Sequence, residues 1–364
     1  MRILFLTRYA AEGPSSRYRF LQYIPYLESA GIHCVVAPFF RPGYLSPRFS
    51  SGNRSGLMLH TLSDYWNRLR ILCTVRKYDL VFIEKEIFPY LPPIFENPFF
   101  HGGPPTVLDY DDAIFHVYDS HANFVVRLLL GNKIPRLMAK TKAVVVGSNY
   151  LYEYACRYNG SSCLLPTVID LKSYPDEPPL REAAEPFTVG WIGSNSTVMY
   201  LRSIAPVLDK FCATHNARFV MIGGNSDPLL IRHLSSVPWS RDAEIRSLSK
   251  IDVGIMPLDA TPFARGKCAF KLIQYMGCWK PVIATPVGEN ARVVEHGVNG
   301  FLADTPQQWF DALELLFGDP TLCQTMGARG RVKVEAEYSL AVTAPRLVEI
   351  LKRSAGEVDY TCVE

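Results

Sequence analysis

Residues Pro262–Gly288 read PFARGKCAFKLIQYMGCWKPVIATPVG, and this stretch holds most of the polar chemistry expected of the chain. It places three cations close together, at Arg265, Lys267 and Lys271. Gly266 lies between the first two and allows the backbone to approach a ligand closely. The cluster therefore predicts a site for an anion.

The sequence predicts a helix from Cys268 onward. Lys267 and Lys271 are four residues apart, so we expect them on one side of its first turn. Free N–H groups at a helix start also favour an anion, which makes a diphosphate clamp plausible. A solvated helix cap flanked by lysines is the alternative. The residues expected to face inward are Phe270, Ile273 and Met276.

A buried strand is expected after this helix. Trp279-Lys280-Pro281 ends the helix, and PVIAT at 281–285 is typical of a parallel strand. Gly288, Glu289 and Asn290 follow at its carboxyl end, where ligands of open α/β sheets bind. These three residues are our candidates for contacts to sugar hydroxyls.

The segment, with VVEHGVNGFL at Val293–Leu302, resembles the signature of GT-B glycosyltransferases of the family-four type (group 1). The resemblance runs from about Phe187 to Leu316. It implies an α/β protein with two Rossmann-like, doubly wound parallel-sheet domains facing a cleft. It also implies a retaining enzyme that uses a nucleotide-diphosphate sugar and needs neither a metal nor another cofactor.

Length and composition agree with two domains. The chain has 364 residues, with 48% hydrophobic and 20% charged residues, as in globular proteins. We expect an N-terminal acceptor domain at 1–168, a linker at 169–186, a C-terminal donor domain at 187–338, and a last helix at 339–364 that returns to the first domain. The linker prediction depends on the Pro- and Glu-rich run KSYPDEPPLREAAEP.

Cysteine usage and hydropathy favour a cytoplasmic protein. Nine cysteines show no CxxC pair and no zinc spacing, which is typical of reduced thiols. The start, MRILFLTRYA, has too short an apolar run for a signal peptide and predicts a first strand. No run approaches the roughly 20 apolar residues of a membrane-spanning helix.

Positive charge is concentrated in the first half. Residues 1–168 hold 18 Lys and Arg against 12 Asp and Glu, and the remainder holds 20 against 23. This excess favours peripheral contact with an anionic membrane or a phosphorylated acceptor, although surface solubility explains it equally well. The aromatic and basic loop Phe39–Gly56 suits such a membrane contact, or it is a flexible crossover. The excess is too small to indicate nucleic-acid binding.

Polar residues follow the expected strands of the first half. The resemblance implies that the loop after strand Ile3–Thr7 faces the cleft, where Gly13 would approach donor phosphates and Ser16 and Arg17 the acceptor. A surface role for the arginine is the alternative.

Three carboxylates follow the strand Thr106–Leu108, at Asp109, Asp111 and Asp112. Clustered acids at a strand end point to a ligand. A DxD metal site lacks further ligands here, so we expect contacts to acceptor hydroxyls, with Asp112 orienting the acceptor. His116 is a further acceptor-side candidate, or a structural histidine.

The second half repeats the strand–loop–helix pattern. Gly193 ends the strand that begins at Phe187, and a turn of hydroxyl and amide side chains follows it, suited to the donor phosphates. The turn residues are Ser194, Asn195, Ser196 and Thr197. The resemblance places Trp239 and Ser240 near the nucleobase, whereas a core role for the tryptophan is equally open.

Three features depart from the family pattern. No Arg or Lys follows the strand at 187–193, so the cations at 265–271 must meet the phosphate charge. Gln274 and Gly266 align with the two glutamates of the family motif, and a neutral Gln274 would contact the ribose. Arg292 replaces a common glutamate.

The leading hypothesis is transfer of a sugar to the hydroxyl of a glycan, lipid-linked or small-molecule acceptor. Lys267 and Lys271 would stabilise the departing diphosphate. Two alternatives remain open. One is a GT-B nucleotide-sugar 2-epimerase, and the other is a non-catalytic nucleotide-sugar-binding partner of another transferase, which the missing Arg/Lys pair motivates.

Overall fold

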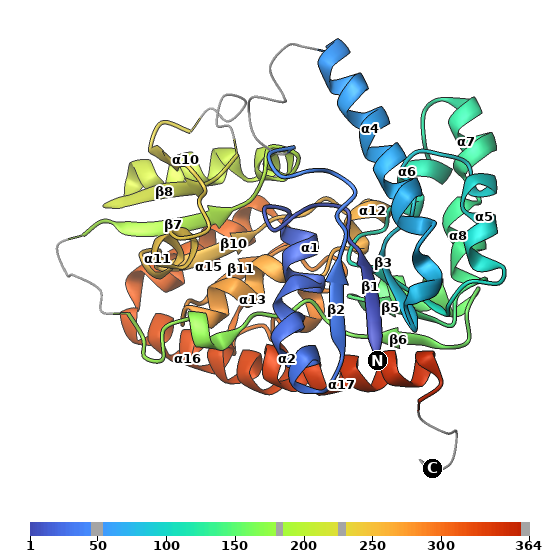
Figure 1. The fold of residues 1–364 in the computed structure, drawn as a ribbon. Coiled ribbons are helices and arrows are strands. Elements are labelled where there is room, and N and C mark those ends of the chain that lie inside the picture. The colour runs from blue at the N-terminus through green and yellow to red at the C-terminus, as the bar shows by residue number, and fades with distance from the viewer. Residues whose placement is uncertain (45–53, 180–184, 225–230, 358–364) are drawn as a thin grey trace. The chain divides into compact units, whose positions relative to one another are not determined.

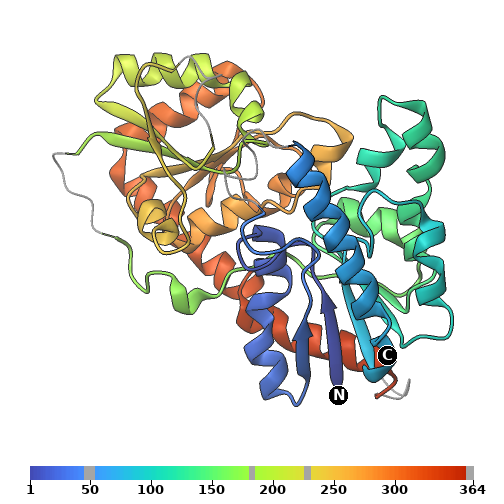
Figure 2. The ribbon, with the colours of Figure 1, turned by 45° about the horizontal axis from the view of Figure 1, so that its top comes forward.

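The computed structural model describes residues 1–44, 54–179, 185–224 and 231–357, which divide into two compact units (Figure 1). Unit 1 comprises 1–167 and 343–364, and unit 2 comprises 168–342. In each unit, helices cover both faces of a parallel sheet (Figures 1 and 2).

The sheet of unit 1 has six strands in the order β2-β1-β3-β4-β5-β6, and every strand pair is parallel. Its central strands are continuous apolar runs because helices cover both faces; LVFIE of β3 is buried throughout. The strands are β1 Arg2–Leu6, β2 His33–Val36, β3 Leu80–Glu84, β4 Thr106–Tyr110, β5 Ala143–Val146 and β6 Ser162–Leu164.

The helices of unit 1 begin where polar residues or proline supply the start signal. Pro14 occupies the first turn of α1, and Ser148 caps α9 by accepting from the N–H of Leu151. The helices are α1 Pro14–Arg19, η1 Leu21–Tyr23, α2 Ile24–Ser29, α4 Arg54–Leu72, η2 Val75–Lys77, η3 Pro93–Phe95, α5 Asn97–Phe100, α6 Phe115–Asp119, α7 Phe124–Leu130, α8 Lys133–Met138, α9 Asn149–Cys156 and α17 Leu340–Ala355, of which 343–355 belong to this unit.

The sheet of unit 2 also has six parallel strands, in the order β12-β11-β10-β7-β8-β9. Its core includes Val189, Phe219, Phe211 and Leu313. The strands are β7 Phe187–Ile192, β8 Ala217–Ile222, β9 Leu234–Val237, β10 Val253–Met256, β11 Val282–Ala284 and β12 Gly300–Leu302. The helices are η4 Leu171–Ser173, η5 Val198–Ser203, α10 Ala205–Thr214, α11 Glu244–Ser249, α12 Pro262–Arg265, α13 Phe270–Gly277, α14 Asn290–Val293, α15 Pro306–Gly318 and α16 Pro320–Glu337.

The strand order of unit 2 reverses between β7 and β10. The chain runs outward from β7 through β8 to β9, and then returns to build β10, β11 and β12 on the other side. Such a reversal separates the loops at the carboxyl ends of the two strands and leaves a place for a ligand.

The predicted doubly wound α/β fold is confirmed. Several elements differ from the prediction. The loop expected after β1 contains α1, because Pro14 starts a helical turn there. The short strands β9 and β12 were not predicted, because a strand of three or four residues is too short to show a clear hydrophobic pattern.

Parts of three predicted segments lie outside the described residues, namely 45–53, 180–184 and 358–364. In the described part of the 39–56 loop, Phe39 and Phe40 are buried and Phe40 stacks on Tyr44. In the described part of the expected linker, Tyr174 is buried.

Candidate functional site

The structure brings the two predicted lysines to the loop that follows β7. The Lys271 ammonium lies 5.6 Å from the centre of the Trp191 ring, and the Lys267 ammonium lies 5.8 Å from that of Tyr200. Trp191 and Tyr200 flank the turn Ser194–Thr197 in the sequence. Both cations therefore lie beside residues that border this turn, at the sheet's point of reversal.

The lysines do not share a helical turn, and that part of the prediction is wrong. Helix α13 starts at Phe270, after Ala269 in the left-handed conformation at φ 52°. Lys267 belongs to the turn between α12 and α13. Tertiary packing against aromatic rings, rather than helical spacing, brings the two ammonium groups to one loop.

The turn after β7 is tight and presents polar groups. Ser194, Asn195 and Ser196 are exposed, and the Ser194 and Ser196 hydroxyls are 2.9 Å apart. The Thr197 hydroxyl donates to the Ser194 carbonyl at 3.0 Å. A Cβ on Gly193 would lie 2.3 Å from the Trp191 ring and 2.7 Å from the Thr197 hydroxyl, so a larger residue would have to displace these side chains.

Gly288 lies directly against the Arg265–Gly266 turn. It has φ +56°, and a Cβ there would lie 2.4 Å from the Arg265 carbonyl oxygen. Arg265 is exposed and Gly266 is buried. The loop after β10 was predicted to bind the phosphates and the loop after β11 to bind the sugar. The two loops therefore lie against each other.

Trp239 and Gln274 meet at a carboxylate that the sequence prediction missed. The Glu244 carboxylate accepts from Trp239 Nε1 at 2.5 Å and from Gln274 Nε2 at 3.0 Å. Glu244 is buried at the start of α11. The sequence around Glu244 does not indicate that this side chain is buried, because it lies on a polar helix and is covered by the loop that carries Trp239. The exposed Ser240 hydroxyl accepts from the Ala243 N–H.

The residues after Gly288 are buried. Asn290 donates from Nδ2 to the carbonyls of Met256 and Thr285, joining the ends of β10 and β11. Glu289 Oε1 lies 3.5 Å from Arg292 Nε. Asn290 therefore supports the strand ends, while Glu289 pairs with the arginine that departs from the family pattern.

In unit 1, Ser16 joins the loop after β1 to the end of β3. Its buried hydroxyl donates to Glu84 Oε2 at 2.6 Å and accepts from the Tyr9 N–H. The Arg8 N–H donates to the same Glu84 oxygen. Gly13, which precedes α1, is buried against Tyr9. These contacts hold the loop in place.

Asp109 lies within the interior of unit 1. Its carboxylate accepts from Arg19 Nε and Nη2, the latter at 2.5 Å, and the two side chains are 2% and 1% exposed. Burial raises the pKa of Asp109 to about 6, although Arg19 acts in the opposite direction. The pair joins α1 to β4.

Asp111 and Asp112 lie next to Lys85, which follows β3 at φ 66°. Lys85 Nζ is 2.9 Å from Asp111 Oδ1 and 3.8 Å from Asp112 Oδ2, and the Asp112 side chain is the more exposed at 32%. Burial alone would raise the pKa of Asp111, but Lys85 and a Ser15 hydrogen bond lower it to about 2. Of the three carboxylates, Asp112 is therefore the most accessible to a ligand.

Lys85→Met should move the acid-unfolding midpoint of the protein to higher pH. The pKa of Asp111 in the fold lies below its ordinary value of 3.8, so its stabilising contribution is present above that value and is lost as the pH falls toward 2. Without the ammonium, burial remains and the pKa rises. Circular dichroism against pH measures the midpoint. An unchanged midpoint, as expected for the exposed control Lys250→Met, would contradict the pairing.

A second buried charge cluster was not predicted. Lys133 lies 2.7 Å from both Glu86 and Glu96 and is fully buried. Arg8 Nη1 is 3.3 Å from Glu86, which also accepts from Tyr118. Lys133 follows a glycine and an asparagine in a polar turn, a context that does not indicate burial. The cluster connects the ends of β1 and β3 to α8.

The remaining acceptor-side candidates are held by neighbours. His116 has Nε2 2.7 Å from the Tyr150 hydroxyl and Nδ1 3.1 Å from Asp119. Arg17 is buried, and its guanidinium lies over the Tyr18 ring. Both are ordered by contacts within unit 1.

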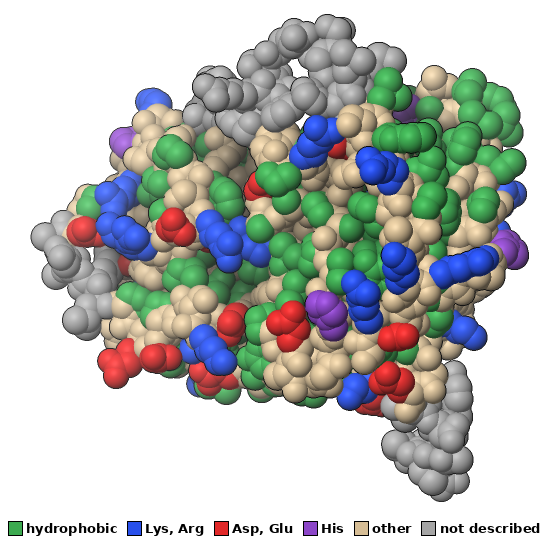
Figure 3. All heavy atoms as spheres, in the orientation of Figure 1, with side chains coloured by type: hydrophobic (Ala, Val, Ile, Leu, Met, Phe, Trp, Pro, Cys, Tyr) green, Lys and Arg blue, Asp and Glu red, His purple; other side chains and the backbone are tan. Residues whose placement is uncertain are grey.

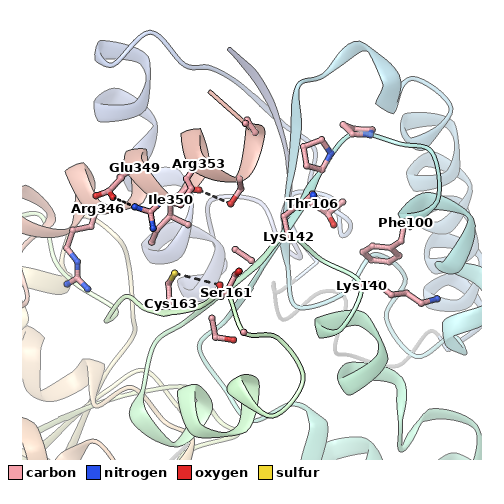
Figure 4. A pocket seen from close by; sticks show the side chains of 18 of the residues that line it. Phe100, Thr106, Lys140, Lys142, Ser161, Cys163, Arg346, Glu349, Ile350 and Arg353 are labelled. Atoms are coloured by element: carbon pink, nitrogen blue, oxygen red, sulfur yellow. Dashed lines mark hydrogen bonds and ion pairs between the residues drawn. The ribbon is translucent and has the colours of Figure 1, made fainter. Parts of the chain in front are cut away.

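A hollow of about 920 Å³ lies at the amino ends of β4 and β5, beside α17 (Figure 4). Three of the four cations that line it bond protein groups: Arg353 pairs with Glu349, Lys140 with Asn97, and Arg346 with the Leu164 carbonyl. It contains none of the predicted site residues.

Residues 187–319 match the family model described as "Glycosyl transferases group 1". The match covers 133 of the 364 residues. The group 1 segment contains the lysines, the turn after β7 and Gly288, so the resemblance predicted from the sequence is confirmed. D-inositol 3-phosphate glycosyltransferase of Thermobispora bispora is 34% identical over 91 residues, 24% of this chain. The match spans only 21% of that relative's length.

Solved structures extend the likeness beyond the group 1 segment to the fold of the whole chain. Sucrose-phosphate synthase from Thermosynechococcus elongatus superposes with a TM-score of 0.72 at 16% identity, covering 98% of this chain and 100% of that one. HepE of Anabaena, solved with UDP-glucose, gives 0.70 at 17% identity, with 97% and 100% covered. The chain has the GT-B fold.

No helix within the described ranges has the length and apolar character needed to cross a bilayer.

Proposed function

We propose that this chain is a retaining glycosyltransferase that moves a sugar from a nucleotide-diphosphate sugar to an acceptor hydroxyl, without a metal or other cofactor. The observation that carries the proposal is the pair of ammonium groups of Lys267 and Lys271 beside the turn after β7. They lie at the point of strand reversal, in a segment of the group 1 family.

The lysines would stabilise the charge that develops during transfer. The bond between the sugar's anomeric carbon and the diphosphate oxygen breaks, and a bond from that carbon to the acceptor oxygen forms. The acceptor proton passes to a leaving-phosphate oxygen. Negative charge grows on the diphosphate, and cations fixed in place before the reaction lower the barrier. Arg265, Gly266 and the N–H groups of Ser194–Ser196 would complete the phosphate site; those of Gly193 and Thr197 donate to the carbonyls of Ile222 and Ser194.

The other residues would bind the rest of the two substrates. Trp239, Ser240 and the Glu244–Gln274 pair suit the nucleoside, and Gly288 and Glu289 suit the sugar. Asp112, the most exposed of the three carboxylates, would orient the acceptor. HepE was solved with UDP-glucose, which makes that donor the first to test. The acceptor would be a glycan, a lipid-linked sugar or a small molecule, and a lipid-linked acceptor would be reached from an anionic membrane surface.

Incubation with a panel of UDP-, GDP- and ADP-sugars tests this proposal. Transfer predicts release of nucleoside diphosphate that depends on an acceptor and persists with EDTA. The absence of Arg and Lys from Ser194–Thr197 specifically favours a second candidate, a non-catalytic donor-binding partner. Binding without turnover on a broad acceptor panel would support that candidate. Epimerised donor in the absence of acceptor would instead support the epimerase.

Gly288→Ala should weaken donor binding by about tenfold or more, since the loss of one charge-assisted contact already costs that much. The new Cβ meets the Arg265 backbone, so the Arg265–Gly266 turn must move. Isothermal titration with the nucleotide sugar measures the effect. Gly297→Ala is the matched control, because Gly297 also has positive φ but nothing within 4 Å. If the two variants bound the nucleotide sugar with equal affinity, Gly288 and the Arg265–Gly266 turn would not belong to the donor site.

A further inference from the structure

Helix α7 in unit 1 turns an apolar face outward. Its exposed apolar side chains lie at positions i, i+1, i+4 and i+5, which share one side of a helix. Leu130 is buried on the opposite side. The outward residues, with their exposed fractions, are Phe124 64%, Val125 55%, Leu128 69% and Leu129 53%. Figure 3 shows hydrophobic side chains gathered over this helix.

A second apolar stripe lies on α4 in the same unit. Leu62, Trp66 and Leu69 are exposed by 56%, 63% and 40%, and their spacing places them on one face. Figures 1 and 2 show that α4 runs along the sheet, whereas α7 lies at the end of unit 1 toward which its strands point. That is also the end that carries Asp112 and His116. Soluble proteins rarely expose apolar side chains in such contiguous groups without a partner.

The charge on α7 and on α8, which packs against it, is of one sign. These two helices hold three cations and no carboxylate. Lys133 is buried with Glu86 and Glu96, whereas Arg127 of α7 and Arg136 of α8 are exposed. Arg127 belongs to α7 itself; its guanidinium lies 5.8 Å from the Phe124 ring and donates to the Ala122 carbonyl. A cation is thus held beside the apolar face, as in helices that lie at a membrane interface.

We propose that α7 inserts its Phe124–Leu129 face into the surface of an anionic lipid bilayer. A bilayer fits better than a protein partner because the exposed charged side chains of α7 and α8 are both arginines, which an anionic lipid surface attracts. The inference deepens the proposed function by supplying the surface from which a lipid-linked acceptor is reached. It does not depend on the lysine site.

Vesicle flotation of the full chain tests the proposal without donor or acceptor, so its outcome is separate from that of any activity assay. The wild type should float with vesicles of equal parts phosphatidylcholine and phosphatidylglycerol, and less with phosphatidylcholine alone or in high salt. Leu128→Ser with Leu129→Ser should lower the partition coefficient by about tenfold or more.

The matched control is Leu315→Ser with Val332→Ser, which removes side chains of similar exposure, 54% and 62%, from α15 and α16 of unit 2. It should float like the wild type, and thermal unfolding should show that both variants fold. Equal flotation of the α7 variant and the wild type would overturn the proposal. A wild-type dimer on size exclusion that the α7 substitutions convert to monomers, without vesicle binding, would assign this face to a second copy of the chain instead.

Discussion

Replacing both Lys267 and Lys271 with alanine should lower turnover by about 100-fold or more, and each single change by about tenfold, roughly 1.4 kcal/mol of transition-state stabilisation apiece. Each ammonium approaches an aromatic ring beside the turn after β7, at 5.6–5.8 Å. In the proposed reaction the diphosphate gains charge as the sugar leaves. A cation held in place stabilises that charge more than it stabilises the bound donor, so the main loss should be in kcat.

Steady-state kinetics with a transferable donor and acceptor measure the effect. The chain offers a matched control in Lys210→Ala, whose ammonium also lies over an aromatic ring, that of Phe310 at 4.6 Å, but on α10. Lys271→Arg keeps the charge and should retain more activity than Lys271→Ala. Full activity of both single alanine variants would place the diphosphate elsewhere.

The second large effect is on stability. Asp109→Ala should reduce the free energy of unfolding by about 3–5 kcal/mol at neutral pH, because it leaves the Arg19 guanidinium buried without its counter-charge. Arg19 is 1% exposed at its side chain and also donates to the Leu165 carbonyl at 2.7 Å, so it cannot readily turn to solvent. Urea unfolding of the variant and the wild type measures the difference.

The control for this change is Asp209→Ala. Asp209 pairs with Arg232, whose side chain is 78% exposed, and such surface pairs contribute about 0–1 kcal/mol. Arg19→Met combined with Asp109→Leu should recover much of the lost stability, since an apolar pair needs no counter-charge. If Asp109→Ala lowered the free energy of unfolding no more than Asp209→Ala does, the Arg19–Asp109 pair would not be what holds α1 to β4.

The sequence predicted the features that depend on local pattern. Buried strands are continuous apolar runs, so the strand predicted at Ile3–Thr7 is observed at Arg2–Leu6 and the strand predicted at 281–285 at Val282–Ala284. The cluster of cations at 265–271 and the carboxylates after β4 could be predicted from the sequence as candidate site residues. Charged residues that follow a buried strand stand out from the apolar residues around them. The helix start was placed two residues early because nothing in CAFK indicates the left-handed Ala269.

Only the tertiary structure decided which of these residues meet. The Glu244 carboxylate accepts from nearby Trp239 and from Gln274, which is 30 residues away. Lys133 lies between Glu86 and Glu96, which are tens of residues before it in the chain. The outward face of α7 was likewise hidden in the sequence, since FVVRLLL is as apolar as a core helix. The periodicity of a segment predicts which of its side chains share an apolar face and which share a polar face. It does not predict which helix or strand buries that face, because burial depends on packing between segments that are distant in the sequence.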